Sequence, residues 1–143
     1  MTWPERAATS HYQTAVAIKE QLQAGNYSEA TAGIEELIEA LSRSERRALK
    51  SQLTRLMAHI IKWRSQPEQR RRSWQATIYD TREEIVEIQE ETPSLNEAVI
   101  RAMWDKCFQT AKRHAEADME QESTANSLSW EEVFSDNYQV EAQ

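Results

Sequence analysis

Apolar residues recur at spacings of three and four along most of the chain, which is the pattern of one-faced α-helices. In residues 44–65 the apolar stripe consists of Leu49, Leu53, Leu56, Met57, Ile60 and Ile61. In residues 28–41 it consists of Ala30, Ile34, Leu37, Ile38 and Leu41. No stretch shows the strict alternation of a half-buried strand, so the pattern predicts an all-α protein.

Capping residues and breakers divide this pattern into helices. Ser10 suits the N-cap of a helix that runs to residue 23, where Gly25 can adopt the positive φ of a helix end. Separate helices are predicted over residues 28–41 and 44–65, the second of them capped by Ser44. Pro67 ends that helix and suits the first turn of another, which extends to residue 91.

The last third of the chain carries two capping-box patterns. Ser94 with Glu97 predicts a helix to about residue 122, and Ser129 with Glu132 predicts a short helix after the polar linker 123–127. The expected architecture is an irregular bundle of about five helices plus a short C-terminal capping helix. Residues 1–9 and 139–143 are expected to be flexible ends.

The length of 143 residues is typical of one domain with one hydrophobic core. No run of about 18 apolar residues is present, so we predict no membrane association, and the N-terminus lacks the pattern of a signal peptide. The single cysteine, Cys107, is expected to be an inert thiol in the core. These features predict a cytoplasmic protein.

Charge is distributed unevenly along the chain, whose net charge is −7. Residues 43–72 hold ten Lys or Arg and only two acidic residues, a net charge of +8. We expect the protein's own carboxylates to neutralise this basic stretch, and the nearest in sequence are Glu35, Glu36 and Glu39. An external nucleic acid is the alternative partner, since phosphate binding requires a basic surface at the contact.

One helical face of residues 52–66 is polar, basic and aromatic, and it adjoins the apolar stripe. At its centre, His59 is flanked by Arg55 and Lys62, whose charges would lower the pKa of the imidazole and keep a neutral base available. A phosphodiester hydrolase would use such a group. The simpler interpretation is a histidine at the helix edge that is hydrogen-bonded to a neighbouring carboxylate.

Two tryptophans and several arginines surround the break at Pro67. Trp63 and Trp74 can stack nucleobases beside the arginines, or they can pack the corner between two helices. The candidate ligand-binding residues are Arg55, His59, Lys62, Trp63, Gln66, Arg71, Arg72, Trp74 and Arg82. No spacing typical of a metal site or a glycine-rich phosphate loop is present, so we expect no metal, no cofactor and no assigned catalytic residue.

The order of these motifs carries a family resemblance. The runs SERRALKSQL, HIIKW and QPEQRRRSWQATI, with the closing SWEEVFSDNY, resemble the bacterial domain-of-unknown-function family 29, which is abundant in cyanobacteria. By position, the family's characteristic residues fall on Glu36, Ser44, Glu45, Arg47, His59, Lys62, Trp63, Gln66, Arg72, Ser73, Trp74 and Arg82. The N-terminal HYQTAVAIKEQ departs from the family's aromatic opening. The resemblance implies a helical bundle and no particular activity.

Three functions remain open at this point. The leading hypothesis is a non-enzymatic helical protein that binds another protein in a regulatory or accessory role, with a homodimer as the expected assembly. The apolar residues on two sides of the helix after residue 94 favour it, because they suggest two neighbours. The alternatives are nucleic-acid or nucleotide binding through residues 55–74 and a helical phosphodiester hydrolase that uses His59.

Overall fold

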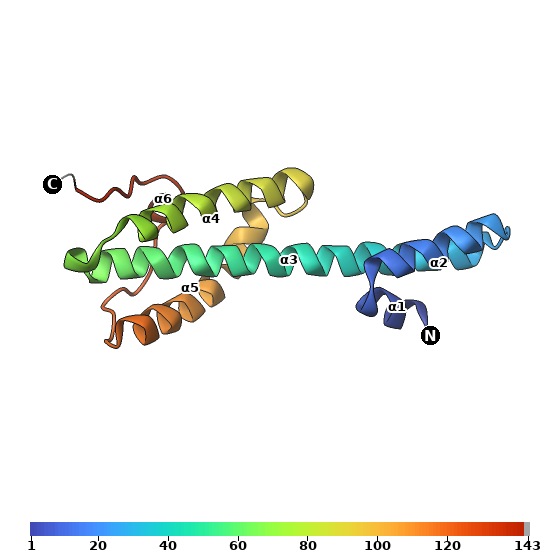
Figure 1. Cartoon of the computed structure of the whole chain (residues 1–143), viewed down its shortest axis with the longest axis horizontal. Coiled ribbons are helices and arrows are strands. Elements are labelled where there is room, and N and C mark those ends of the chain that lie inside the picture. The colour runs from blue at the N-terminus through green and yellow to red at the C-terminus, as the bar shows by residue number, and fades with distance from the viewer. Residues whose placement is uncertain (142–143) are drawn as a thin grey trace. The chain divides into compact units, whose positions relative to one another are not determined.

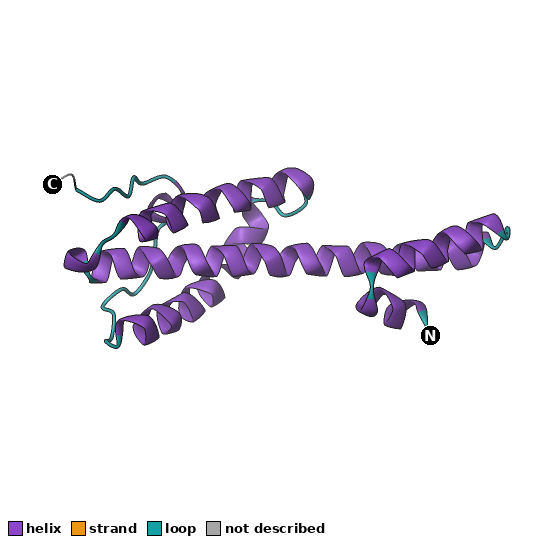
Figure 2. Cartoon of the chain, in the orientation of Figure 1, coloured by secondary structure: helices purple, strands orange, loops and turns teal. Residues whose placement is uncertain are grey.

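The computed structural model of the chain describes residues 1–141. Over that range it contains six α-helices, one short 3-10 helix and no strand, which confirms the all-α prediction (Figure 2). The chain forms two compact units, residues 1–47 and residues 48–143. The single domain predicted from the length stays a prediction, and the two units are described in turn.

The first unit contains a helix that the apolar pattern did not predict, α1 (Trp3–Thr9), followed by α2 (His11–Gln23) and the beginning of α3 (Tyr27–Ser65). The hydroxyl of Thr2 caps α1 by accepting from the backbone N–H of Glu5. Ser10 caps α2 as predicted. Seven residues are too few for a repeating apolar pattern, which is why α1 escaped detection.

Small side chains form the core of the first unit. Its buried residues are Ala7, Thr14, Ala17, Ile18, Ala30, Gly33 and Ala40. Gly25 turns the chain between α2 and α3 with the predicted positive φ, at 79°. Gly33 lies against the Trp3 ring so closely that an added Cβ would fall 2.9 Å from Trp3 Cζ3. Small residues in this unit therefore let the side chains of Trp3 and Ile18 pack directly against the backbone of α3.

The predicted break between residues 41 and 44 is wrong, because α3 runs without interruption from Tyr27 to Ser65 (Figure 1). The segment Ser42-Arg43-Ser44 contains neither glycine nor proline. A serine inside a helix costs only a few tenths of a kcal/mol relative to alanine, about 0.5. A capping residue followed by good helix formers therefore does not start a new helix when nothing stops the preceding one.

The second unit contains the end of α3, the 3-10 helix η1 (Pro67–Gln69), α4 (Arg72–Glu91), α5 (Glu97–Met119) and α6 (Trp130–Phe134). Two predicted starts are wrong. Pro67 begins η1 rather than α4, and Asn96, not Ser94, caps α5 by accepting from the Val99 N–H at 3.2 Å. The asparagine side chain lies at the position from which it reaches the third helical N–H.

The predicted capping box of α6 is confirmed: Ser129 and Glu132 each accept the other's backbone N–H, both at 3.1 Å. Residues 135–141 contain no helix, but Val140 N–H donates to Gln75 Oε1 at 2.9 Å. Of the end predicted to be flexible, residues 142–143 lie outside the described residues.

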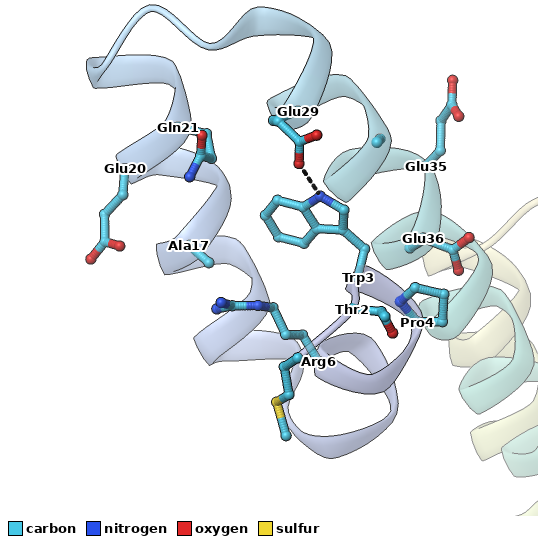
Figure 3. A pocket seen from close by; sticks show the side chains of 12 residues that line it. Thr2, Trp3, Pro4, Arg6, Ala17, Glu20, Gln21, Glu29, Glu35 and Glu36 are labelled. Atoms are coloured by element: carbon cyan, nitrogen blue, oxygen red, sulfur yellow. Dashed lines mark hydrogen bonds between the residues drawn. The ribbon is translucent and has the colours of Figure 1, made fainter.

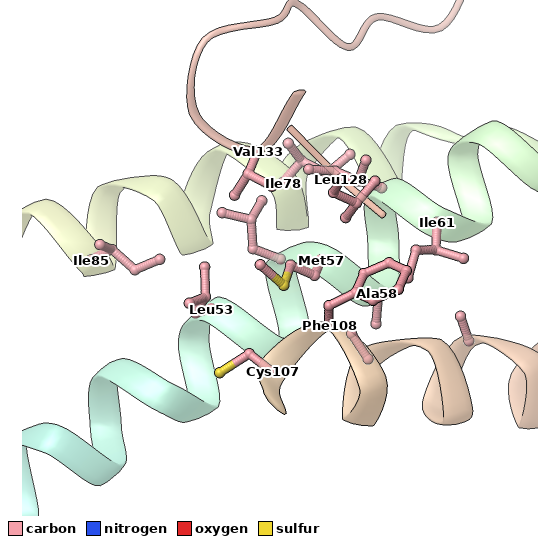
Figure 4. Packing of buried hydrophobic residues seen from close by; sticks show 14 of the residues in the cluster. Leu53, Met57, Ala58, Ile61, Ile78, Ile85, Cys107, Phe108, Leu128 and Val133 are labelled. Atoms are coloured by element: carbon pink, nitrogen blue, oxygen red, sulfur yellow. The ribbon is translucent and has the colours of Figure 1, made fainter. Parts of the chain in front are cut away.

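The core of the second unit is built on the predicted stripe of α3. Met57 and Leu53 face Ile78 and Ile85 of α4 on one side and Phe108 of α5 on another (Figure 4). All six residues of that stripe have no solvent-exposed area, and Cys107 is equally buried. Each fully buried Leu, Ile or Met contributes about 1.5–3 kcal/mol, so this stripe is the main source of stability in the unit.

Candidate functional site

The basic stretch ends at the corner between α3 and α4, where Arg70 folds back onto Trp63. Arg70 Nε donates to the Trp63 carbonyl oxygen at 2.8 Å, and its guanidinium carbon lies 4.8 Å from the Trp63 ring centroid. Carbonyls in the last turn of a helix have no partner within the helix. The Arg70 side chain therefore caps the C-terminus of α3 and also covers the indole ring of Trp63.

Lys62 lies one residue before Trp63 and its side chain is buried against α4 and α5. Its Nζ lies 5.4 Å from the Trp74 ring centroid and 3.3 Å from Asp118 Oδ2. Arg71 approaches the same Trp74 ring, with its guanidinium carbon 5.4 Å from the centroid. A cation within about 6 Å of an indole face is attracted by the negative charge of that face. Lys62 and Arg71 therefore both form cation–π contacts with the Trp74 ring.

Arg82 connects α4 to the C-terminal segment. Its Nε donates to the Val133 carbonyl at 2.8 Å, and its guanidinium carbon lies 5.4 Å from the ring centroids of both Tyr79 and Tyr138. Tyr138 packs edge-on against Trp63, with ring centroids 5.6 Å apart and planes at 86°. These contacts join α3, α4 and the segment after α6 into one packed group.

Burial strongly affects the Tyr138 hydroxyl. Desolvation, with the charges of Asp136 and Glu132 as smaller causes, raises the pKa of Tyr138 to about 12, while Arg82 and Arg64 act in the opposite direction. The neutral hydroxyl donates to the Glu132 carbonyl at 2.6 Å. Lys62, Trp63, Arg70, Arg71, Trp74, Arg82 and Tyr138 are called the basic–aromatic cluster below.

His59 lies on α3 one turn before Lys62 and is half-buried. Its Nδ1 is 3.0 Å from the Arg55 carbonyl oxygen, which requires the tautomer that carries its proton on Nδ1. Burial lowers the pKa of His59, the hydrogen bond to Arg55 opposes this, and the charges of Lys62 and Arg55 lower it further. The expected carboxylate partner is thus replaced by a backbone carbonyl within the helix, and desolvation outweighs the neighbouring cations.

The structure brings together five of the nine predicted binding residues: Lys62, Trp63, Arg71, Trp74 and Arg82. Within residues 1–141, the side chains of Arg55, Gln66 and Arg72 form no hydrogen bond or ion pair. Sequence reasoning missed the partners Asp118 and Tyr138, because pairings of residues more than fifty positions apart leave no local pattern.

Three carboxylates pair with the basic stretch, and only one of them, Glu39, is among those predicted. Lys62 pairs with Asp118, and Arg64 Nη1 pairs with Glu132 Oε2 at 3.0 Å. Of the three predicted glutamates, Glu39 pairs with Arg43 one turn further along α3, at 3.8 Å. Glu35 and Glu36 form no ion pair in the described part of the chain. Because α3 has no break at residues 41–44, the chain does not fold back there.

Glu35 and Glu36 instead line a pocket in the first unit, of about 520 Å³ (Figure 3). The Trp3 indole N–H donates to Glu29 Oε2 at 3.0 Å across this pocket, and Arg6 lies over the Trp3 ring with 5.6 Å to the centroid. No group of three or more His, Cys, Asp or Glu side chains arranged to hold a metal ion occurs among residues 1–141.

A second feature of the first unit is an exposed row of large apolar side chains on α3. Tyr27 is 67% exposed, Ile34 41%, Ile38 60% and Leu41 43%. These four residues are called the α3 stripe below. The sequence pattern predicted an apolar face on residues 28–41. Of the five residues in that predicted face, only Ala30 is fully buried. The small side chains take the interior and the large ones face outward.

Comparisons with known proteins place the chain in one family. Neither the curated proteins nor the solved structures include a match. No helix in the described residues has the length and apolar character needed to cross a membrane. A family model, described as domain of unknown function DUF29, matches residues 9–139, nearly the whole chain. The chain therefore belongs to the DUF29 family, as its central motifs predicted.

Proposed function

We propose that this protein is a non-enzymatic helical module that binds protein, and that its partner is a second copy of the same chain. The observation that carries the proposal is the exposure of the α3 stripe. Four large apolar side chains lie on one helix within fifteen residues, while the core of the unit is built mainly from alanines, with one isoleucine and one threonine. We infer an interaction site from this row, because exposed large apolar side chains that gather on one helix face are typical of a binding surface.

The basic–aromatic cluster supports a structural role for the corner between α3 and α4. Its donors already have acceptors in this chain: Arg70 bonds the Trp63 carbonyl, Arg82 bonds the Val133 carbonyl, and Lys62 pairs with Asp118. Trp63 and Trp74 are only 5% and 9% exposed, so neither indole offers an open face for a nucleobase. The cluster stabilises the bundle in this proposal, and the α3 stripe performs the binding, in a regulatory or accessory role.

The proposed location is the cytoplasm. Cys107 is the single cysteine of the sequence and a free thiol, so the chain has no disulfide of its own, which supports a reducing compartment.

Light scattering on the full-length chain across a dilution series tests the proposal. We expect the mass of a dimer, which decreases toward that of a monomer on dilution. Replacing Ile38 with Glu places a charge in the middle of the α3 stripe and should give a monomer at every concentration. Circular dichroism should show unchanged helix content in this variant, because Ile38 is 60% exposed and contributes little to the core.

Val86→Glu is the matched control. Val86 is another exposed apolar residue, at 51%, on α4 of the second unit. This variant should remain a dimer. A wild-type chain that is monomeric at all concentrations would contradict the proposal. A gel-mobility shift of RNA or DNA by the wild-type chain at low salt would also contradict the proposal, if that shift is lost when Arg71 and Arg72 are replaced with Glu. Such a result would support nucleic-acid binding instead.

A further inference from the structure

A second pocket in the first unit differs in charge from the pocket beside Trp3. Its volume is about 270 Å³, and its polar lining side chains are His11 of α2 and Arg43, Ser44 and Arg47 of α3. No carboxylate lines this pocket, whereas four glutamates line the one beside Trp3. Two arginines and a histidine around one cavity indicate an anion as its ligand, because every charge they can carry is positive.

The two arginines continue the face by which α3 packs against α1 and α2. Gly33, which lies against Trp3 and Ile18, belongs to that face, and so does the buried Ala40. At 100° per residue both arginines and Ser44 lie within an arc of about 100° that also contains these two small residues. Alanines of α1 and α3 form the rest of the lining. Their methyl groups leave the space between the helices open at this end of the unit.

The polar groups around this pocket have few partners within the chain. Among residues 1–141, the side chains of His11, Ser44 and Arg47 form no hydrogen bond or ion pair. Arg43 pairs with Glu39 at 3.8 Å, but both side chains remain more than half exposed, at 55% and 67%. Solvent screens an ion pair of this kind. An anion in the pocket would therefore not have to displace a strong partner.

We propose that this pocket binds a phosphate group, either as the free ion or on a small organic molecule. A phosphate group on an organic molecule carries a charge of about −1.5 to −2 at pH 7 and offers three strong acceptor oxygens. Two arginine forks can each bind a pair of these oxygens, while the Ser44 hydroxyl and a ring N–H of His11 supply further donors. A carboxylate has one charge and two oxygens, so it would leave part of these donors unused.

The size and lining of the pocket favour a small ligand over a nucleic-acid strand. Its 270 Å³ lies slightly below the range of pockets for drug-sized ligands, about 300–1,000 Å³. No Trp, Tyr or Phe lines it, so it lacks the stacking surface with which proteins bind single strands. This inference does not rest on the proposed function, because the pocket is centred about 140° around α3 from the α3 stripe.

Calorimetric titration of the full-length chain tests the ligand class. The probes are inorganic phosphate, glycerol 3-phosphate and acetate, each at the same ionic strength. We expect phosphate binding at one site per chain, about tenfold tighter than that of acetate. Tighter binding of inorganic phosphate would identify the free ion as the ligand, and tighter binding of glycerol 3-phosphate a small phosphorylated molecule. Failure of both to bind, or acetate binding as tightly as phosphate, would overturn the proposal.

A pair of single substitutions tests the location. Arg47→Gln should weaken phosphate binding by about tenfold, because it removes one of the two guanidinium forks. Arg46→Gln is the matched control, since it removes the same charge from the next position on α3 but lies outside the pocket lining. This control should bind phosphate as the wild type does. Both arginines are exposed, so circular dichroism should show unchanged helix content in both variants.

A steric substitution tests the pocket without changing its charge. Ala8 is exposed and lines the pocket, so Ala8→Leu should fill part of the space and weaken phosphate binding. Equal weakening by Arg46→Gln and Arg47→Gln would show general attraction to a basic surface and would overturn the proposal. A short RNA that binds the wild type and displaces phosphate, with equal dependence on both arginines, would overturn it in favour of an extended nucleic-acid surface.

Discussion

Arg70 and Trp63 are joined twice, by a 2.8 Å hydrogen bond from the guanidinium to the tryptophan carbonyl and by the guanidinium lying 4.8 Å from the ring centroid. Arg70 lies seven positions after Trp63, and the 3-10 helix η1 makes up the second half of the interval between them. The corner between α3 and α4 is therefore closed by a side chain rather than by the tight backbone turn that Pro67 alone would suggest.

Replacing Arg70 with Ala removes both contacts and leaves the Trp63 carbonyl without its partner. We expect the free energy of unfolding to fall by about 1–2 kcal/mol, the combined size of one hydrogen bond and one cation–π contact. Arg72→Ala is the control, because Arg72 is exposed and should change stability by less than about 0.5 kcal/mol. Urea unfolding measures both, and equal effects would show that the corner does not depend on Arg70.

The pair of Lys62 and Asp118 joins an 11% exposed ammonium to a 65% exposed carboxylate. Asp118→Asn should destabilise the protein by only about 0.5–1 kcal/mol, because solvent screens the carboxylate. Lys62→Met should be close to neutral, since it removes a charge from a largely buried position beside Trp74. Unfolding at low and high salt tests this prediction. The loss of unfolding free energy caused by Asp118→Asn should be smaller in 1 M salt, where the Debye length is about 3 Å. Asp105→Asn, at an exposed position, is the control.

Stability should fall at high pH because of Tyr138. The pKa of Tyr138 is raised to about 12, whereas that of an unfolded tyrosine is about 10. Above pH 10 the unfolded chain therefore loses this proton while the folded chain keeps it. The stabilisation is complete below pH 10 and is lost as the pH rises through 12, by at most about 1.4 kcal/mol per pH unit.

Tyr138→Phe should reduce this slope between pH 10 and 12, although it also removes the hydrogen bond to Glu132 and lowers stability at neutral pH. Tyr12→Phe, at a residue that is 74% exposed, should leave the slope unchanged. Guanidinium unfolding curves at several pH values provide the comparison. Identical slopes in the wild type and the Tyr138 variant would refute the assignment.

Gly33 is inside a helix, where alanine would ordinarily stabilise the fold by about 1 kcal/mol. Here the added Cβ would lie 2.7 Å from Ile18 Cγ1 and 2.9 Å from Trp3 Cζ3. We therefore expect Gly33→Ala to lower stability by about 1–3 kcal/mol through overpacking.

Gly25→Ala provides a contrast to Gly33→Ala, because its Cβ would meet nothing within 4 Å and its cost comes only from the positive φ of 79°. Thermal unfolding followed by Trp fluorescence should show loss of the Trp3 environment in the Gly33 variant alone. A Gly33→Ala protein that is as stable as the wild type would show that Trp3 does not rest on this glycine.

Much of the fold could be predicted because its signals are local. The stripe from Leu49 to Ile61, the turn at Gly25 and the capping box of Ser129 each depend on residues within a few positions of one another. The break predicted before Ser44 was wrong for a related reason. A capping residue only permits a helix to begin, and whether the preceding helix ends there depends on the absence of a breaker and on tertiary packing.

The candidate site was predictable only in part. Lys62, Trp63 and Trp74 were identified as a basic and aromatic group, and they do lie together. Their partners Asp118 and Tyr138 could not be identified, because only the packed bundle brings α5 and the C-terminal segment to α3.

By itself, the sequence determined the helical class, most of the helix ends and the family, since backbone hydrogen bonds and caps form between near neighbours. Tertiary structure alone decided that Asp118 and Glu132 pair with the basic stretch, and which apolar stripe stays uncovered. Both the residues from Leu49 to Ile61 and those of the α3 stripe have the spacing of a buried face. The first is covered by α4 and α5, while Ile38 remains 60% exposed. Burial depends on what packs against a face, and periodicity reports only that the face exists.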